Sequence, residues 1–199
     1  MRKVTQIRRF SEIPERFLEL LAVIFSVFGF FVVILHLKIH RDMCKIRLFL
    51  TDVDGTLTDG GMYYTAEGDA MKKFNTRDGM GLQLLQKTGV KVGIITSENT
   101  AIVTKRAEKL GLDYLVQGKR DGGKLAATRE ICEATGIGLS EVAYIGDDVN
   151  CAELLRSVGI AACPADAMPQ VKAIPGIRIM SLKGGEGCVR EFINELLGY

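Results

Sequence analysis

Six polar side chains that can do chemistry follow the apolar runs of the sequence, each near the point where a run ends. They are Asp52, Asp54, Thr96, Lys124, Asp147 and Asp148. Residues two apart in an extended chain point the same way, so Asp52 and Asp54 can reach one site together. A cluster of carboxylates repels itself unless a cation lies among it. Mg²⁺ suits such a site because it prefers oxygen ligands and also binds substrate phosphate.

These residue types suit the transfer of a phosphoryl group. We expect Asp52 to attack phosphorus as the nucleophile and to form an aspartyl-phosphate. Asp54 would act as general acid and base, first protonating the leaving alcohol and then activating water. Thr96 and Lys124 would hold the phosphoryl oxygens as negative charge builds, with Mg²⁺ as the cofactor that offsets the charge of the two anions. Gly55 would allow the tight turn that brings backbone N–H groups close to the phosphate.

The elements that must position these residues alternate along the chain. From Lys45 onward, short apolar runs rich in β-branched residues alternate with amphipathic segments such as Thr100–Leu110. Continuous apolar strands between helices predict a doubly wound α/β fold, in which helices cover both faces of a parallel sheet. In such a sheet the ligand site lies beyond the carboxyl ends of the strands. Gly60–Thr76 is too short for a helical crossover and predicts a β-hairpin inserted after the first strand.

The composition is that of one catalytic domain with an appendage. The chain has 199 residues, of which 47% are hydrophobic and 25% charged, enough to bury a full core. The net charge of +2 and the lack of a long basic run give no support for nucleic-acid binding. Five cysteines lie far apart, and their odd total argues against a disulfide framework and a zinc site. A reducing cytosol is the simpler interpretation.

The amino-terminal part differs from the rest. Leu20–Leu37 contains no Lys, Arg, Asp or Glu and is about long enough to cross a bilayer as a helix. Basic residues lie on both sides of it, so the positive-inside rule gives no clear orientation. We therefore divide the chain into an apolar segment, 1–42, which is either transmembrane or not part of the native protein, and a catalytic domain, 43–199. A cytoplasmic enzyme is the main expectation, and membrane anchoring through residues 17–37 is the alternative.

Two other classes of protein share part of this pattern. Gly118–Lys124 (GKRDGGK) matches the core of a nucleotide-binding loop, but Leu125 stands where such loops need Ser or Thr to ligate Mg²⁺. A phosphoacceptor signalling domain also has acids, Thr and Lys at strand ends. Its acceptor Asp would follow the third strand, whereas here that strand is followed by Gln117 and Gly118. Multiple turnover of a phosphate ester separates the enzyme from the signalling domain.

The motifs resemble those of a known superfamily. The stretches DVDGTLTDGG, IITSEN and YIGDDVN, together with Lys124, are similar to the four motifs of the haloacid-dehalogenase phosphatases. The hairpin, KKFNTRDGMG and GGEGCVREF resemble the branch without a large cap, which acts on 3-deoxy-D-manno-octulosonate 8-phosphate (KDO 8-phosphate) or on related sialic-type acid 9-phosphates. The resemblance covers residues 45–197.

The resemblance implies a metal site and an assembly. Asp52 and Asp147 would bind Mg²⁺ through their side chains, and Asp54 through its backbone carbonyl. Members of this branch are homotetramers in which the hairpin and carboxyl-terminal tail of one subunit approach a neighbour's site. The ligand would be a small sugar-acid phosphate. The residues implied to contact it are Asp54, Asn75, Thr76, Arg77, Asp78, Gly79, Arg106, Lys124 and Asn150.

Two departures from the branch bear on the substrate. Octulosonate phosphatases commonly have Gly-Arg after the second-motif Thr, whereas this chain has Ser97 and Glu98. An acidic residue there resembles the phosphatases of nine-carbon acids, and Glu98 could accept hydrogen bonds from a longer polyol chain. We therefore expect an α-keto 3-deoxy sugar acid phosphate and favour nine carbons over the eight of KDO 8-phosphate. The second departure is the pair Gly122 and Gly123, which is inserted before Lys124 and leaves the place of that amine open.

Overall fold

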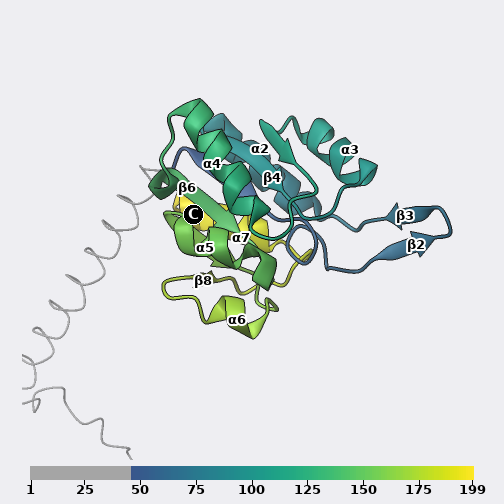
Figure 1. The fold of residues 1–199 in the computed structure, drawn as a ribbon. Helices are drawn as coiled ribbons and strands as arrows, with labels where there is room; N and C mark the ends of the chain where they lie inside the picture. Colours follow the sequence, from purple (N-terminus) through teal and green to yellow (C-terminus); the bar gives the residue numbers. More distant parts are fainter. Residues whose placement is uncertain (1–45) are drawn as a thin grey trace, which may run out of the picture. The chain divides into compact units, whose positions relative to one another are not determined.

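The computed structural model of the protein describes residues 46–199. At its centre is a parallel sheet of six strands in the order β5-β4-β1-β6-β7-β8 (Figure 1). The strands are β1 (Leu48–Thr51), β4 (Lys91–Ile95), β5 (Tyr114–Val116), β6 (Val142–Ile145), β7 (Ile160–Cys163) and β8 (Arg178–Ile179). The order reverses direction on either side of β1, so the predicted doubly wound sheet is confirmed.

The first strand lies in the middle of this sheet because its side chains are buried and its backbone is paired along both edges. All four residues of β1 are buried, and both of its edges are paired in parallel. Leu48 lies opposite Lys91 of β4 on one side and Val142 of β6 on the other. A strand that is apolar on both faces fits only where helices cover both faces.

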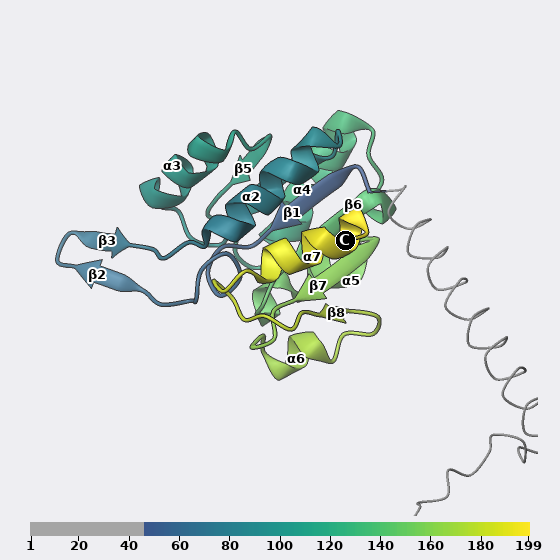
Figure 2. The ribbon, with the colours of Figure 1, turned by 180° about the vertical axis from the view of Figure 1, so that it is seen from behind.

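Helices cover the two faces and bury separate apolar clusters. On one face lie α2 (Thr76–Lys87), α3 (Ala101–Leu110) and α7 (Cys188–Leu197). Figure 2 shows α2 and α7 side by side across the sheet, and the Phe192 ring lies 5.7 Å from that of Phe49. The other face carries α4 (Gly123–Thr135), α5 (Ala152–Ser157), the short α6 (Pro169–Lys172), and the 3-10 turns η1 (Leu139–Glu141) and η2 (Val149–Cys151).

The predicted hairpin is confirmed and stands apart from the sheet. Strands β2 (Tyr63–Thr65) and β3 (Gly68–Met71) pair with each other in an antiparallel ribbon that extends away from the body of the domain (Figure 1). Most of its side chains are exposed, and Tyr64 retains 60% of its surface. An isolated ribbon of two strands is marginal in water, so contacts at its base must hold it.

Among residues 46–199, no helix is both long and apolar enough to cross a membrane. The apolar stretch 20–37 and the predicted division at residue 42 lie outside the described residues.

Candidate active site

A pocket of about 300 Å³ opens beyond the carboxyl ends of β1, β4 and β6, where the strand order reverses. Five of the six side chains singled out from the sequence line it. Its lining consists of Asp52, Asp54, Gly55, Gly60, Met62, Thr96, Ser97, Glu98, Asp147, Asp148 and Asn150. The sixth, Lys124, reaches the same place from the floor, through its contact with Asp52. Parallel strands bring these residues together because their carboxyl ends share one edge of the sheet.

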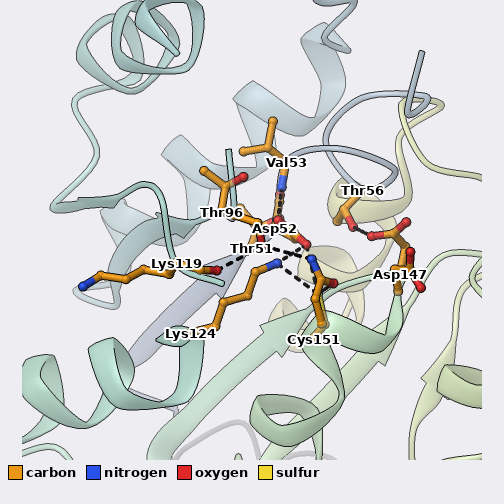
Figure 3. A network of polar contacts seen from close by, with 12 residues as sticks. Thr51, Asp52, Val53, Thr56, Thr96, Lys119, Lys124, Asp147 and Cys151 are labelled. Carbon is orange, nitrogen blue, oxygen red and sulfur yellow. Dashed lines mark hydrogen bonds and ion pairs between the residues drawn. The ribbon is translucent and has the colours of Figure 1, made fainter. Parts of the chain in front are cut away.

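Asp52 is held at both of its carboxylate oxygens (Figure 3). Its Oδ1 accepts a hydrogen bond from the Val53 backbone N–H at 2.8 Å. Its Oδ2 accepts from the Lys124 ammonium at 2.5 Å and from the Cys151 thiol at 2.9 Å. With the residue only 4% exposed, the carboxylate has one fixed orientation toward the pocket. Such fixing is what a nucleophile requires for in-line attack.

The place of Lys124 is settled by the turn that precedes it. Asp121 and Gly122 both adopt left-handed backbone angles, and Gly123 N–H donates to the Arg120 carbonyl at 2.8 Å. The inserted glycines thus end this turn at Gly122 and begin α4 at Gly123. The Lys124 side chain then faces inward, with the residue 1% exposed. Burial lowers the pKa of Lys124, but the Asp52 carboxylate outweighs burial and leaves that pKa raised. The amine is therefore a cation that neutralises Asp52.

Asp147 faces Asp52 across the pocket, and the two acids concentrate negative charge there. Burial, and then the Asp52 carboxylate, raise the pKa of Asp147 to about 7. Gly55 lies so close that a Cβ there would be 2.0 Å from Asp147 Oδ2, and its φ of +77° also favours glycine. The Thr56 hydroxyl donates to Asp147 Oδ1 at 3.4 Å. Burial and the neighbouring Asp52 carboxylate both disfavour the ionised form of Asp147, so this pair of acids fits a divalent cation, which would stabilise that form.

Cys151 is a member of this cluster that sequence reasoning missed. Its Sγ lies within 4.8 Å of an oxygen of both Asp52 and Asp147. Burial, and then Asp52, raise the pKa of the thiol to about 12, so the sulfur is protonated and donates to the carboxylate. The Tyr144 hydroxyl also contacts the sulfur, at 3.2 Å. No spacing rule marks a single cysteine of this kind in a sequence.

Thr96 and its neighbours form the wall beside Asp52. Thr96 is buried, and its Oγ1 accepts from the Glu98 N–H at 3.4 Å. The Asn150 side chain donates to the Ser97 hydroxyl at 3.0 Å and so links the loop after β4 to the loop after β6. The Glu98 carboxylate pairs with Arg120 at 2.8 Å. Glu98, which replaces the Arg that is common in octulosonate phosphatases, is therefore paired with a cation that sequence reasoning did not identify.

Asp54 pairs with a buried lysine, which sequence reasoning also missed. Lys72 follows β3, and its Nζ lies 2.5 Å from Asp54 Oδ1. The other oxygen, Oδ2, is buried and has no hydrogen-bond partner among residues 46–199. A buried acceptor without a donor is costly, and an unpartnered oxygen on a residue that lines a pocket is available to a ligand donor.

The remaining predicted substrate residues lie outside this pocket. They gather at the start of α2 and on the facing side of α3: Asn75, Thr76, Arg77, Asp78, Gly79 and Arg106. None of them lines the pocket beside Asp52. The Asn75 amide donates to the Gly185 carbonyl, Asp78 accepts from the Arg190 N–H, and Arg106 donates to the Asn75 carbonyl. In a single chain these side chains tie loops together.

The loop before α7 packs against the loop that follows β1. A Cβ on Gly184 would lie 2.0 Å from the Gly55 carbonyl oxygen, so only glycine fits there. The Gly185 N–H donates to the Thr56 carbonyl at 3.0 Å. The segment GGEG thus holds the turn that faces Asp147.

The nucleotide-loop alternative does not match the geometry. In nucleotide-binding loops the lysine reaches toward phosphates held by the loop backbone. Here the Lys124 ammonium is buried against Asp52, and the loop before it folds as a turn that ends in Gly122.

An acidic cluster at the switch point of a doubly wound sheet, with a buried lysine on the leading Asp, defines a class of phosphoryl-transfer hydrolases. A model of the haloacid dehalogenase-like hydrolases matches residues 77–159. The chain is 37% identical over 154 residues to the 3-deoxy-D-manno-octulosonate 8-phosphate phosphatase of Yersinia pestis, covering 77% of this chain and 80% of that protein. The phosphatase of the same name from Escherichia coli K12 has the same identity and coverage.

Solved structures give the same result. The crystal structure of the Yersinia pestis phosphatase has a TM-score of 0.74 at 36% identity, covering 79% of this chain and 83% of that one. The Moraxella catarrhalis phosphatase, solved with a magnesium ion, a phosphate ion and KDO, has a TM-score of 0.75 at 37% identity, covering 81% and 91%. The chain belongs to the haloacid dehalogenase-like hydrolases, in the family of the 3-deoxy-D-manno-octulosonate 8-phosphate phosphatases. It is a phosphoric monoester hydrolase, which excludes the signalling domain.

Proposed function

We propose that this protein is a Mg²⁺-dependent phosphatase that removes the terminal phosphate of an α-keto 3-deoxy sugar acid through an aspartyl-phosphate. The observation that carries the proposal is the fixed Asp52 carboxylate. It lies against the Lys124 ammonium at 2.5 Å, opens on the pocket and is followed two residues later by Asp54. A buried carboxylate with this pairing suits nucleophilic attack on an anionic phosphate.

The side chains divide the two half-reactions between them. Asp52 attacks phosphorus, the ester P–O bond breaks, and Asp54 gives its proton to the departing alkoxide. Asp54 then takes a proton from water, the water oxygen attacks phosphorus, and inorganic phosphate leaves with Asp52 restored. Lys124 and the Thr96 hydroxyl lie where they can meet the phosphoryl oxygens during both steps. Proton transfer by a placed carboxyl contributes about 10²- to 10⁴-fold to such reactions.

The acidic cluster would hold the metal. Asp52 and Asp147 would bind Mg²⁺ through their carboxylates and Asp54 through its carbonyl. The ion would supply positive charge between carboxylate and phosphate. The raised pKa of Asp147 supports this assignment, because the two acids repel each other without a cation. The related phosphatase from Moraxella catarrhalis was solved with magnesium.

Recognition of the sugar acid requires more than one chain. The pocket beside Asp52 contains no unpaired cation for a substrate carboxylate among the described residues that line it. Arg77 at the start of α2 and Arg106 on the facing side of α3 supply cations outside the pocket. We infer a homotetramer, in which these residues and a hairpin too small to cover its own site approach the pocket of a neighbour. Guanidinium groups bind carboxylates with two parallel hydrogen bonds, which favours an acidic sugar phosphate.

The length of the substrate depends on the rim of the pocket. Glu98 lines the pocket and is paired with Arg120, so the rim offers both an acceptor for hydroxyl groups and a cation. We retain nine-carbon sialic-type acid 9-phosphates as the favoured substrates and KDO 8-phosphate as the second candidate. Glu98→Arg should move the ratio of kcat/KM for the two acids toward KDO 8-phosphate. If the parent preferred KDO 8-phosphate and Glu98→Arg left the ratio of kcat/KM unchanged, Glu98 would not select the substrate.

Phosphate release by the full chain tests the function. We expect release from KDO 8-phosphate and from the nine-carbon 9-phosphate with Mg²⁺ present. Release should stop in EDTA and return on adding Mg²⁺. Glucose 6-phosphate, which lacks the carboxylate, should be a poor substrate. Equal turnover of glucose 6-phosphate would contradict the sugar-acid assignment, and no release from any ester would contradict the phosphatase itself.

A further inference from the structure

Lys72 is a buried cation at the base of the hairpin for which the mechanism above has no task. Its side chain is 1% exposed, and its Nζ lies 2.5 Å from Asp54 Oδ1 and 3.6 Å from the Met62 sulfur. Taking an ammonium out of water costs several kcal/mol unless a close partner offsets it. Asp54 is that partner.

The next residue shows that this burial is not forced on the segment. Lys73 is 53% exposed and pairs on the surface with Glu186 at 2.8 Å and Asp59 at 3.5 Å. The two lysines are adjacent and chemically identical, yet only Lys72 turns inward. The chain therefore directs one ammonium group specifically at the carboxylate of Asp54.

The pair determines how Asp54 presents its second oxygen. Oδ1 is occupied by Lys72, whereas Oδ2 is buried and has no partner within residues 46–199. A carboxylate side chain with one oxygen fixed by a charge-assisted bond loses its freedom to swing. The free oxygen is then the one left to exchange a proton with the leaving alcohol or with water in the pocket that Asp54 lines.

We propose that Lys72 is the positioning residue for Asp54, so that the hairpin insert holds the general acid and base in place. The proposal rests on the proposed function, because it gives Asp54 that role. Lys72 acts through Asp54 and does not touch the phosphate. The hairpin then has a second task besides approaching a neighbouring subunit: its return strand delivers the group that orients the proton donor.

Leaving-group dependence tests the proposal. The variant is Lys72→Met, and Lys73→Met is the matched control. For a sugar-acid phosphate we expect kcat to fall about 100-fold in Lys72→Met with KM within about threefold, because a misplaced catalytic group costs about that much. Release of p-nitrophenolate in the first turnover of p-nitrophenyl phosphate should fall less than about fivefold, since this leaving group departs without a proton. Lys73→Met should match the parent in both assays.

A purely structural role predicts a different result. It would lower both rates of Lys72→Met by the same factor, and that outcome would overturn the proposal. So would parental kcat on the sugar-acid phosphate. Lys72→Arg, which keeps the donor and the charge, should recover at least about a tenth of the parental kcat, in line with the strength of charge-assisted bonds.

A second background keeps the test decisive if Lys72→Met does not fold. In Asp54→Asn the carboxylate is gone, so adding Lys72→Met should leave the first-turnover rate unchanged within about twofold. A further loss of tenfold in the double variant would show that Lys72 acts elsewhere, and the proposal would fail. The proposed function is tested separately. If the parent protein hydrolyses phosphate esters and Asp52→Asn does not, the proposed function stands whether or not the Lys72 proposal fails.

Discussion

The edge of the sheet around Asp52 and the start of α2 were both expected to bind substrate, but the structure arranges them differently. At the sheet edge, Asp52 contacts Lys124 directly, and Asp147 faces the same pocket. At the start of α2, the side chains bond to loops of their own chain and do not reach that pocket. One chain therefore assembles the groups that we propose for the chemical step. In the same proposal, the residues that select the sugar acid meet the ligand only with a second chain.

The difference follows from how each set of residues is placed. The proposed catalytic residues follow separate parallel strands, and the sheet brings the ends of these strands to one edge whatever the loops do. The residues at the start of α2 follow a hairpin that extends away from the domain (Figure 2), and contacts with the loop before α7 and with α7 itself hold them outside the pocket.

Asp52→Asn gives the largest expected loss and tests the first region. The amide keeps the shape but cannot attack phosphorus, so kcat should fall by about 10⁴-fold or more, as when other nucleophiles are removed. Phosphate release from the sugar-acid phosphate measures it, with circular dichroism to confirm folding. If a folded Asp52→Asn variant turned over at the parental rate, the nucleophile would have to be a different group.

Gly55→Ala should have the next largest effect. The new Cβ would lie 2.0 Å from Asp147 Oδ2, so this carboxylate, a proposed metal ligand, must shift. We expect kcat to fall about 100-fold at saturating substrate, the usual effect of misplacing a catalytic group. The Mg²⁺ concentration for half-maximal rate should rise at the same time.

Gly111→Ala is the matched control for this change. Gly111 has a similar left-handed φ of +63°, compared with +77° at Gly55, but nothing in residues 46–199 comes within 4 Å of an added Cβ. Gly111→Ala therefore introduces the same backbone strain of about 1 kcal/mol but no close contact of the new Cβ. Equal losses of activity in the two variants would mean that strain, and not the approach to Asp147, explains the glycine.

The sequence was sufficient for the strand-end residues of the first region and not for the side chains that pair with them. Asp52, Asp147 and Thr96 could be predicted because alternation of strands and helices fixes where strand ends meet. The choice between Lys72 and Lys73 could not, because adjacent identical residues carry no signal of which one turns inward. Likewise, Arg120 pairs with Glu98 across 22 positions of the chain, and only the folded turn before α4 brings them together.

Arg106→Met tests whether the second region serves a neighbouring subunit. If Arg106 binds the substrate carboxylate, kcat/KM should fall about 10- to 100-fold through KM, the usual worth of a charged hydrogen bond. Mixing this variant with inactive Asp52→Asn chains should restore part of the activity, because some sites would then combine the native residue of each chain. Light scattering should report a tetramer for each variant.

Lack of recovery after mixing, with exchange of subunits shown by mass spectrometry of the mixed tetramers, would contradict a shared site. A monomer with full activity would contradict it more directly. The substrate carboxylate would then have to be bound by Arg120, which is the cation beside the pocket rim.

Asp78→Asn gives the smallest expected effect and concerns the stability of the second region. Asp78 is buried at the start of α2, its Oδ1 accepts from the Arg190 N–H, and its Oδ2 has no partner among residues 46–199. Burial raises the pKa of Asp78 to about 6, from the 3.8 of the unfolded chain. Between these values the folded state holds a proton that the unfolded state has lost, so the free energy of unfolding decreases as the pH rises from 4 to 6.

Above pH 6 the loss is complete, and Asp78→Asn should then be more stable than the parent by about 1–2 kcal/mol, which is part of the roughly 3 kcal/mol that a shift of about two pKa units represents at 1.36 kcal/mol per unit. At pH 4.5 the two should unfold at nearly the same urea concentration. Glu108→Gln, an exposed acid on α3, should show no such dependence on pH. If Asp78→Asn were less stable at both pH values, Asp78 would serve to stabilise the fold through its contact with Arg190. If instead the variant is stabilised, Asp78 is a charge kept at a cost to folding. That is what a binding residue does, because selection for a ligand retains groups that selection for stability alone would replace.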